Sequence, residues 1–426
     1  MSEPSDRQYR APRGTQDVLP ADQPYWDLVR GTVSRLCLRF GYAQIATPIF
    51  EEASVFTRGV GDVTDIVQKE MYVFKDRGGQ ELALRPEGTA PICRAYLEHG
   101  MHNQPQPVRL FYIAPNFRYD RPQAGRYRQH HQFGAEAIGE GDASVDAEII
   151  ELLWRLYEEL GLTGLTLNLN SIGDQNCRPA YLEILRAYYA DKLDRVCDDC
   201  RVRYDRNPLR LLDCKQERCQ PVIAGAPAMT DHLCAACAVH FDDLRSYLVA
   251  AGIPFALNSG LVRGLDYYTR TVFEVEPKEE RSQSSIGGGG RYDGLIELLG
   301  GPPTPGIGFG TGIERIILNL KRQEVPVAGA KSVRVYIAVQ TAEARVRAFQ
   351  LASELRRAGI PAQAGASGRS LKSQMRHADG LGAEYVAIIG ERELRDGSVT
   401  LKRLATGEQE TVAAADVAGR VAKHGD

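Results

Sequence analysis

The chain has 426 residues, of which 43% are apolar and 25% charged, and its formal net charge at pH 7 is −3. These values are ordinary for a soluble globular protein of two or three domains, and they exclude a disordered chain, a collagen and a small disulfide scaffold. The near balance of charge argues against a protein whose only function is to coat nucleic acid, because such proteins are usually strongly basic.

Glycine is the one residue type in excess, with 42 residues in the chain. This is about a tenth of the residues, against about 7% in an average protein. Much of the glycine falls in two stretches, 287–294 and 306–312. Because glycine has no side chain, other groups can approach its backbone closely. The two stretches therefore indicate backbone that lies against a ligand.

The apolar runs and the cysteines indicate neither a membrane protein nor a secreted one. No run of 18 apolar residues occurs, so we expect no transmembrane helix and no membrane partner. The first twenty residues are polar and unlike a signal peptide. The nine cysteines are odd in number and mostly clustered, unlike a secreted disulfide framework. We expect a cytoplasmic protein with reduced thiols.

Helix and strand patterns run from the N-terminus to about residue 320. A helix is predicted over 24–40, where Gly41 closes it, and another over 144–160 from apolar residues at helical spacing. Strands are predicted at 42–50, where Pro48 interrupts the strand, and at 71–76, 81–86, 109–120, 129–139, 164–173, 271–277 and 306–312. Many antiparallel strands flanked by helices predict an α+β domain, and no Rossmann or P-loop motif occurs.

The pattern changes after a short linker at 326–332. Beyond it, strands predicted at 332–340, 361–364, 384–390 and 398–404 alternate with a helix, which favours a small α/β domain. Residues 327–426 hold 15 Lys and Arg against 11 Asp and Glu, a net of +4, whereas the rest of the chain holds 37 against 44. The C-terminal domain is therefore the basic one.

Two segments combine acidic and hydroxyl or amide side chains near strand ends. Glu87 and Thr89 lie beside Gly88, and a carboxylate next to a hydroxyl suits an ammonium group. The same residues are also typical of a capped helix start with a surface salt bridge. Gln132 and Glu136 alternate along a predicted strand and share one face. If that face lines a pocket, both side chains are available to bind a polar ligand.

Arginines gather at three places. Four of them lie within eleven residues: Arg118, Arg121, Arg126 and Arg128. A planar guanidinium binds phosphates with two hydrogen bonds. Arg263 precedes Tyr267 and Tyr268 and a strand, which fits the wall of a pocket. Arg315 starts a helix after a glycine strand, where it can bind a terminal phosphate. The alternatives are a basic hairpin tip and tight strand–helix packing.

Together these motifs resemble those of class II aminoacyl-tRNA synthetases and, within them, the histidyl-tRNA synthetase family. The resemblance covers nearly the whole chain, and LVRGLDYY is its most specific part. The matching motifs are RGTQDVLP (13–20), TPIFE (47–51), RPEGT (85–89), FRYDRP and GRYRQ (117–129), LVRGLDYY (261–268), GGGRYDGL (288–295) and GIGFGTGIERI (306–316).

The resemblance implies an α+β fold with a class II antiparallel-sheet catalytic core over 1–325. A mainly helical domain is expected as an insertion at about 175–255 of this core. A linker at 326–332 leads to an anticodon-binding α/β domain at 333–426, whose positive charge suits phosphate contacts. TPIFE resembles the class II dimer motif, so the resemblance also implies a homodimer.

The implied activity is that of a histidine–tRNA ligase, which uses ATP with Mg²⁺ to form histidyl-adenylate and then charges the 3′ end of tRNA(His). Catalysis is expected from positioning and electrostatic stabilisation. The family's histidine site would map to Glu87, Thr89, Gln132, Glu136, Tyr267 and Tyr268. Its catalytic arginines would be Arg118 and Arg263, its ATP site Arg118, Arg126, His130 and Arg315, and its tRNA contacts Arg121 and Arg128.

Within this set, Glu87, Thr89 and Gln132 would hold the α-ammonium group of histidine, and Glu136 and Tyr268 would read its imidazole. Arg263 resembles a substitute for a metal ion at the α-phosphate. At His130 this chain departs from the aromatic residue expected to stack on adenine, although an imidazole is also flat.

Two other functions are weighed against the ligase. One is a non-catalytic paralogue that acts as regulatory subunit of ATP phosphoribosyltransferase, and the other is a different class II synthetase. Non-catalytic paralogues typically lack the C-terminal domain and parts of the arginine set, whereas this chain has both. LVRGLDYY argues against another class II synthetase.

Six cysteines cluster in the expected insertion: Cys197, Cys200, Cys214, Cys219, Cys234 and Cys237. The first and last pairs are CxxC motifs 33 residues apart, which together resemble a Zn(Cys)₄ knuckle. The alternative is that the cysteines are buried free thiols that pack as small apolar groups. A structural Zn²⁺ is therefore a possibility that the sequence leaves open.

Overall fold

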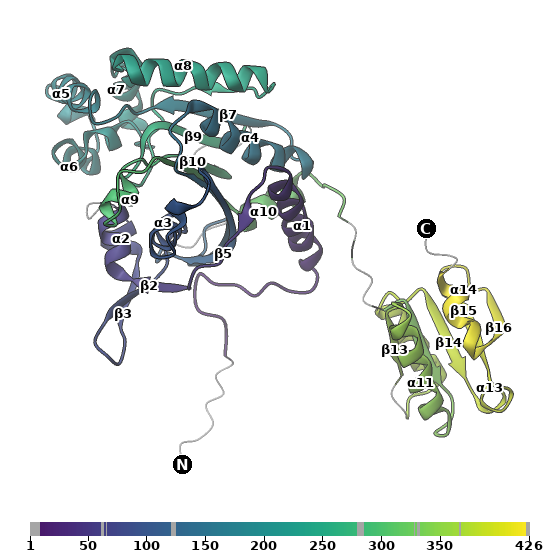
Figure 1. Ribbon diagram of the computed structural model, residues 1–426. Helices are drawn as coiled ribbons and strands as arrows, with labels where there is room; N and C mark the ends of the chain where they lie inside the picture. The colour runs from purple at the N-terminus through teal and green to yellow at the C-terminus, as the bar shows by residue number, and fades with distance from the viewer. Residues whose placement is uncertain are drawn as a thin grey trace. The chain divides into compact units, whose positions relative to one another are not determined.

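The computed structural model describes residues 9–60, 64, 66–120, 125–278, 285–327, 329, 333–365 and 368–422. The chain divides into two compact units, Met1–Val327 and Ala328–Asp426 (Figure 1). Each unit has its own hydrophobic core. Most of the predicted linker lies outside the described residues.

A sheet of eight strands forms the centre of the first unit. All pairings in it are antiparallel except the two at its edges, β1 with β5 and β7 with β8. In spatial order the strands are β1 (Ala43–Gln44), β5 (Val108–Phe117), β6 (Gln129–Ile138), β11 (Gly306–Gly312), β10 (Gly287–Arg291), β9 (Thr269–Pro277), β7 (Leu165–Ser171) and β8 (Ala256–Leu257). The predicted α+β class with a mainly antiparallel sheet is confirmed.

Helices cover both faces of this sheet because its strands alternate apolar residues to either side. Phe111 of β5 packs with helices on one face, whereas Leu110 and Tyr112 pack on the other. The first face carries α1 (Gln23–Arg39), α4 (Ala143–Glu159) and α10 (Ile313–Arg322). The second carries α2 (Ala53–Val60), α3 (Thr89–Glu98) and α9 (Leu295–Leu298). Figure 1 shows α3 within the curve of the sheet.

A small sheet of β2 (Phe50–Glu52), β4 (Glu81–Leu84) and β3 (Tyr72–Lys75) lies beside this second face. The hairpin predicted at 71–86 is confirmed as β3 and β4. The interruption predicted at Pro48 within 42–50 is confirmed, because Pro48 separates β1 from β2. Arg85 fixes this break, since its guanidinium donates to the carbonyl oxygens of Thr47 at 2.8 Å and Pro48 at 3.2 Å.

Residues 178–250 are helical apart from connecting loops. Their α-helices are α5 (Arg178–Tyr189), α6 (Asp198–Arg206), α7 (Gln220–Ala224) and α8 (Ala235–Ala250). Short 3₁₀ turns join them: η3 (Leu193–Arg195), η4 (Pro208–Leu211), η5 (Glu217–Cys219) and η6 (Met229–His232). No single described helix is long and apolar enough to cross a membrane, and only the bent pair Glu217–His232 and Ala235–Ala250 passes by length and composition.

The cysteines of this region do not form the predicted knuckle. Cys197 and Cys200 lie with Cys214 and Cys219, whereas Cys234 and Cys237 lie with Asp174 and Cys177. The pairing of the two CxxC motifs in one site is therefore wrong. Sequence spacing cannot reveal which cysteines meet, because the chain between them folds back on itself.

The second unit is an α/β domain with one sheet. Its strand order is β13 (Ala362–Ala364), β12 (Val335–Val339), β14 (Tyr385–Ile389), β15 (Ser398–Arg403) and β16 (Gln409–Ala413). The first three strands are parallel and the last two antiparallel. Its helices are α11 (Ala344–Arg357), α12 (Leu371–Gly380), α13 (Glu391–Asp396) and α14 (Val417–Ala422). The sequence patterns missed β16, α12, α13 and α14.

Candidate active site

A cavity of about 450 Å³ opens in the first unit at β6, β10 and β11. Six of the residues predicted for a site line it: Arg118, Arg126, His130, Gln132, Arg263 and Arg315. Arg210, Glu274 and Glu314 also line it, together with Gly287, Gly288, Gly310 and Gly312. The glycine stretches singled out in the sequence therefore form part of a cavity wall.

The glycines of β11 leave room for the polar side chains of β6. A Cβ atom on Gly308 would lie 1.7 Å from Glu136 Oε2, and one on Gly310 would lie 1.7 Å from Gln132 Nε2. Both distances are impossible for a real side chain. The sequence indicated glycine next to a ligand, whereas the structure shows that these two glycines first accommodate Glu136 and Gln132.

Glu136 is a fully buried carboxyl that accepts two side-chain hydrogen bonds. Thr89 Oγ1 donates to its Oε1 at 2.8 Å, and the hydroxyl of Tyr292 donates to its Oε2 at 2.7 Å. Burial raises the pKa of Glu136 to about 8, although both hydrogen bonds lower it. Tyr292 lies within the GGGGRYDG stretch, but nothing in that pattern indicated its contact with Glu136.

This raised pKa makes the stability of the protein depend on pH. A carboxyl with a pKa of about 8 when folded and 4.5 when unfolded stabilises the fold below pH 4.5, and this contribution is lost as the pH rises to 8. We expect the Tm of Glu136→Gln to rise relative to wild type between pH 5 and 8, and then to level off. The underlying slope is at most about 1.4 kcal/mol per pH unit.

The check is thermal unfolding of both proteins at pH values from 5 to 9. Glu81→Gln is the matched control, because Glu81 is exposed on β4. A difference in Tm between wild type and Glu136→Gln that does not change with pH would contradict the expectation.

Glu87 closes the start of α3. Its Oε2 accepts from the backbone N–H of Thr89 at 2.7 Å, and its Oε1 accepts from that of Ala90 at 2.8 Å. Burial raises the pKa of Glu87, while these hydrogen bonds and the charge of Arg118 lower it. The helix-cap alternative for this motif therefore describes part of its structure, and each oxygen keeps a lone pair for another donor.

Gln132 is held by neighbours that sequence reasoning missed. Asn116 Nδ2 donates to Gln132 Oε1 at 2.5 Å, and the Tyr112 hydroxyl lies 3.5 Å from the same atom. With its oxygen occupied, Gln132 presents its amide NH₂ elsewhere. The buried Asn116 Oδ1 has no hydrogen-bond partner in the described part of the chain. The only sequence feature of Asn116 was its place in a predicted strand.

Arg263 lies against the glycines of β10. Its Nη1 forms an ion pair with Glu274 Oε1 at 3.0 Å, whereas its buried Nε has no hydrogen-bond partner among the described residues. Burial opposes the charge of Arg263, but Glu274 and the neighbouring tyrosines outweigh it and raise its pKa. Gly288 leaves room for the guanidinium, because a Cβ there would lie 3.1 Å from Nη1.

The residues after Arg263 form a buried aromatic cluster, and its Tyr267 and Tyr268 are not among the residues that line this cavity. The rings of Tyr267 and Tyr268 lie 4.7 Å apart, and Tyr267 also contacts Tyr292 at 6.0 Å edge to face. Both predicted tyrosines are buried. A Cβ on Gly290 would lie 2.9 Å from the Tyr268 ring. The glycines of β10 therefore accommodate the side chains of the 263–268 segment.

Two residues of the helical insertion brace this segment. Arg210 Nη1 donates to the carbonyl oxygen of Arg263 at 3.1 Å, and Asn207 Nδ2 donates to Asp266 Oδ1 at 2.9 Å. Both lie at or next to η4. Neither residue was among the site residues predicted from the sequence.

Three further arginines surround the cavity. Arg118 Nε donates to the carbonyl of Pro86 at 2.8 Å, and Arg126 pairs with Asp120 at 3.1 Å. Arg315 Nε donates to the carbonyl of Gly125 at 3.0 Å. Each guanidinium has further N–H groups for a ligand. The repulsion of Arg118 and Arg126 adds to burial in lowering the pKa of Arg315, which favours an anion here.

His130 lies between these arginines as a neutral ring. Burial, together with the charges of Arg118 and Arg315, lowers its pKa to about 3. Its neighbour His131 is fixed by Glu314, which accepts from both its backbone N–H and Nδ1 at 2.9 Å. A flat, uncharged imidazole is thus available for stacking at the position where the sequence departs from an aromatic residue.

Of the two residues predicted to contact tRNA, the described part of the chain includes only Arg128. Arg121 is outside the described residues. Arg128 is not among the lining residues, and its guanidinium lies 3.8 Å from the centre of the Tyr119 ring. Arg128 Nε also donates to the carbonyl of Asp120 at 3.4 Å.

Comparison with known proteins decides the family. The family model of histidyl-tRNA synthetase matches residues 14–316, and that of an anticodon binding domain matches residues 333–424. The chain belongs to the histidyl-tRNA synthetase family. The resemblance drawn from the motifs is thereby confirmed.

Curated relatives of this family match over nearly their whole length. Histidine–tRNA ligase of Dehalococcoides mccartyi is 55% identical over 404 residues, which are 95% of this chain and 97% of that protein. Histidine–tRNA ligase of Pelotomaculum thermopropionicum is 49% identical over 401 residues, 94% of each chain.

Solved structures of histidyl-tRNA synthetases share the fold. The apo structure of the S. aureus histidyl-tRNA synthetase has a TM-score of 0.82 and 37% identity, and the match covers 97% of this chain and 100% of that one. That of Nostoc sp. has a TM-score of 0.69, with 98% and 100% covered, and at 20% identity it shows only the fold.

Proposed function

We propose that this chain is a histidine–tRNA ligase. In the first step a carboxylate oxygen of histidine attacks the α-phosphorus of ATP, supplied as its Mg²⁺ complex, and pyrophosphate leaves. In the second, a ribose hydroxyl at the 3′ end of tRNA(His) attacks the carbonyl carbon of the adenylate, and AMP leaves. One observation supports this proposal. Glu136 forms a buried hydrogen-bonding network with Thr89 and Tyr292, and this network lies next to an arginine-lined cavity.

The histidine site is assigned to the buried end of this arrangement. We assign the imidazole to Glu136 and Tyr268, and the α-ammonium group to Glu87, Thr89 and Gln132, with Tyr267 as a wall. Glu87 and Glu136 supply two carboxyl groups in a space with little water, where a substrate with two nitrogen donors fits better than an apolar one.

The ATP site is assigned to the arginine-lined end. Arg118 and Arg263 would contact the carboxylate and the α-phosphate, so that the charge developing in the transition state meets fixed guanidinium groups. Arg126 and Arg315 would bind the β- and γ-phosphates, and the neutral ring of His130 would stack on adenine. Mg²⁺ is expected to be held largely by the phosphates.

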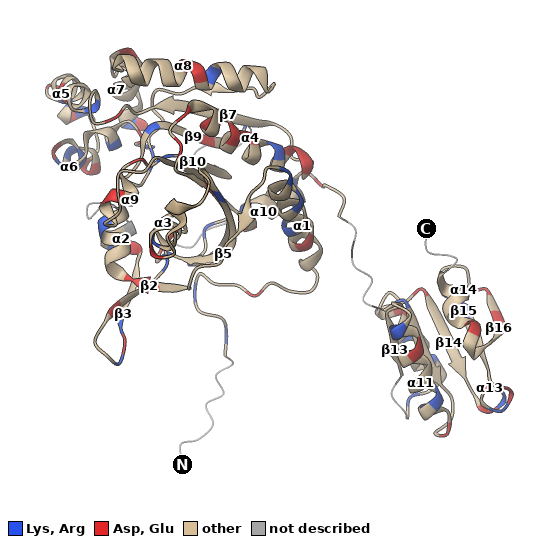
Figure 2. Cartoon of the chain, viewed as in Figure 1, with Lys and Arg blue, Asp and Glu red and all other residues tan. Residues whose placement is uncertain are grey.

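The tRNA would contact both units. We assign the acceptor end to Arg121 and Arg128, and the anticodon to residues 333–426. Basic residues of this unit include four arginines on α11, which Figure 2 shows in blue: Arg345, Arg347, Arg356 and Arg357. These suit contacts with the phosphate backbone.

We further propose a cytoplasmic homodimer joined through the 47–51 segment. Residues 1–325 would form the catalytic core, with about 175–255 as its inserted domain.

Aminoacylation tests this assignment against the regulatory paralogue. With ATP, Mg²⁺ and tRNA(His), the full chain should attach histidine to the 3′ end, and periodate-oxidised tRNA should not be charged. Binding of histidine without any charging, together with activation of an ATP phosphoribosyltransferase, would favour the paralogue instead.

One glycine offers a steric test of the histidine site. Gly308→Ala places a methyl group on the carboxyl of Glu136, so that carboxyl must move. We expect the KM for histidine to rise at least about tenfold, a loss of about 1.4 kcal/mol or more, with a smaller change in the KM for ATP. Steady-state pyrophosphate exchange measures both constants.

Gly294→Ala is the matched control, because a Cβ there meets no atom within 4 Å. It should leave both constants close to wild type. If Gly308→Ala keeps the wild-type KM for histidine, the placement of the imidazole at Glu136 is wrong.

A further inference from the structure

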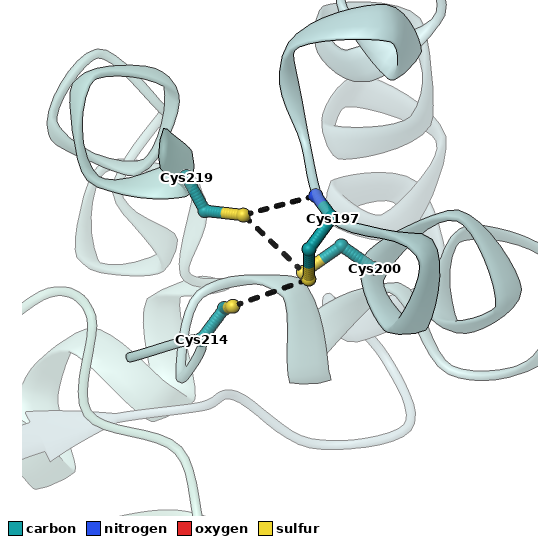
Figure 3. Close-up of side chains that lie close together, drawn as sticks. All are labelled: Cys197, Cys200, Cys214 and Cys219. Atoms are coloured by element: carbon teal, nitrogen blue, oxygen red, sulfur yellow. Dashed lines mark hydrogen bonds between the residues drawn. The ribbon is translucent and has the colours of Figure 1, made fainter. Parts of the chain in front are cut away.

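The four cysteines Cys197, Cys200, Cys214 and Cys219 converge on one point in the helical insertion (Figure 3). The Sγ atoms of Cys197 and Cys214 are 3.7 Å apart, and those of Cys200 and Cys219 are 4.0 Å apart. All four sulfur atoms lie within 4.8 Å of one another. A tetrahedral zinc with Zn–S bonds of about 2.3 Å holds its sulfurs about 3.8 Å apart. The spacing thus matches the metal site and not a disulfide, whose sulfurs are about 2.05 Å apart.

From this geometry we propose that the four cysteines bind one structural Zn²⁺. Cys200, Cys214 and Cys219 are buried and Cys197 is only partly exposed, which gives a closed site without an open position for substrate. The backbone N–H of Cys197 already points at Cys219 Sγ, 3.2 Å away. Such an N–H stabilises a metal-bound thiolate.

Few side chains of the surrounding elements α6 and η5 are buried. Cys200 is the only buried residue of α6, and Cys219 is the only one of η5. Besides Cys200, Tyr204 of α6 packs against the core only in part, so the apolar face of this helix is small. Small segments without a sufficient core are commonly held by a metal. Zinc would therefore add to the stability of α6 and η5.

This segment also reaches the cavity. Asn207 and Arg210 lie between Cys200 and Cys214, and they donate to Asp266 and to the carbonyl of Arg263. A metal that fixes the segment would also fix these two braces. The role of this metal is structural and not catalytic, because no cysteine of the group is among the residues that line the cavity.

The second group, Asp174 with Cys177, Cys234 and Cys237, is a weaker candidate. Asp174 Oδ2 is engaged by Arg270 at 3.3 Å, and its Oδ1 accepts from the backbone N–H of Asn176 at 2.9 Å. The carboxylate is thus already satisfied by the protein. We make no proposal for this group, and the experiment below separates the two.

Metal analysis of the full chain, purified without an affinity tag, tests the proposal. We expect Cys214→Ser and Cys219→Ser each to contain about one zinc per chain less than wild type. Cys37→Ser is the control, because Cys37 is a buried cysteine that belongs to neither group, and its zinc content should equal that of wild type. Losses in these two variants also distinguish this site from one built on the two CxxC motifs, which would not need Cys214 or Cys219.

A second measurement uses the wild-type protein, so the proposal can be tested even if the variants fail to fold. Treatment with a strong zinc chelator should make the four cysteines react with iodoacetamide, as identified by mass spectrometry, and should expose the 197–219 segment to protease. The proposal is overturned if wild type contains less than about 0.2 zinc per chain, if iron replaces zinc, if Cys219→Ser retains the full zinc content, or if chelation leaves the four thiols unreactive.

Discussion

Arg263→Ala is expected to slow histidine-dependent adenylate formation by about 10²–10³-fold. This is the cost of removing one preorganised group that stabilises charge in a transition state. Arg263 fits that role because its guanidinium is already oriented by Glu274 and lies at the cavity, while its buried Nε has no partner among the described residues. The effect should fall on kcat more than on the KM values, because the interaction strengthens as negative charge develops.

Pyrophosphate exchange measures this step without tRNA. Arg109→Ala is the matched control, because Arg109 forms a comparable, partly exposed ion pair with Glu148 at 2.8 Å but is not among the cavity-lining residues. Arg109→Ala should keep an exchange rate close to wild type, and Arg263→Ala should keep wild-type tRNA affinity. Near-wild-type exchange in Arg263→Ala would refute its assignment as a catalytic residue.

Glu136→Gln should lower kcat/KM for histidine by about 10²-fold or more, about 3 kcal/mol. The two oxygens of Glu136 each accept one donor, from Thr89 and from Tyr292. A glutamine at this position has one acceptor oxygen, and its NH₂ group cannot accept a hydrogen bond. The hydroxyls of Thr89 and Tyr292 and the imidazole N–H would therefore compete for that single oxygen. Buried hydrogen-bonding sites discriminate strongly for this reason.

Tyr292→Phe separates recognition from packing. It removes one donor to Glu136 but keeps the carboxyl, and a single neutral hydrogen bond is worth about 1 kcal/mol, or about fivefold in kcat/KM. Exchange kinetics at several histidine concentrations give the comparison. A larger loss in Tyr292→Phe than in Glu136→Gln would place the imidazole away from Glu136.

Much of this site could be predicted because its residues lie in short, patterned segments. The alternation of Gln132 and Glu136 follows from strand geometry alone, and their placement on one face is set before any tertiary contact forms. The arginines at 118, 126, 263 and 315 are evident in the sequence pattern, the resemblance gives them roles, and all four line one cavity.

Other features depended on contacts that spacing does not encode. The register of β6 against β11 decides that Gly308 faces Glu136, and a shift of one residue would change it. Tyr292 and Arg210 come from segments 156 and 53 residues away from their partners, and the contact of Asn116 with Gln132 depends on the register of the β5–β6 hairpin. The cysteine pairing was predicted wrongly because CxxC motifs show which thiols are adjacent but not which pairs converge in space.

Histidine specificity is the central claim, and pyrophosphate exchange with each of the twenty amino acids tests it most directly. We predict ATP–pyrophosphate exchange with histidine alone, at a rate that Arg263→Ala and Glu136→Gln strongly reduce. Comparable exchange with another amino acid, or no exchange with any, would contradict the assignment of this cavity to histidine activation.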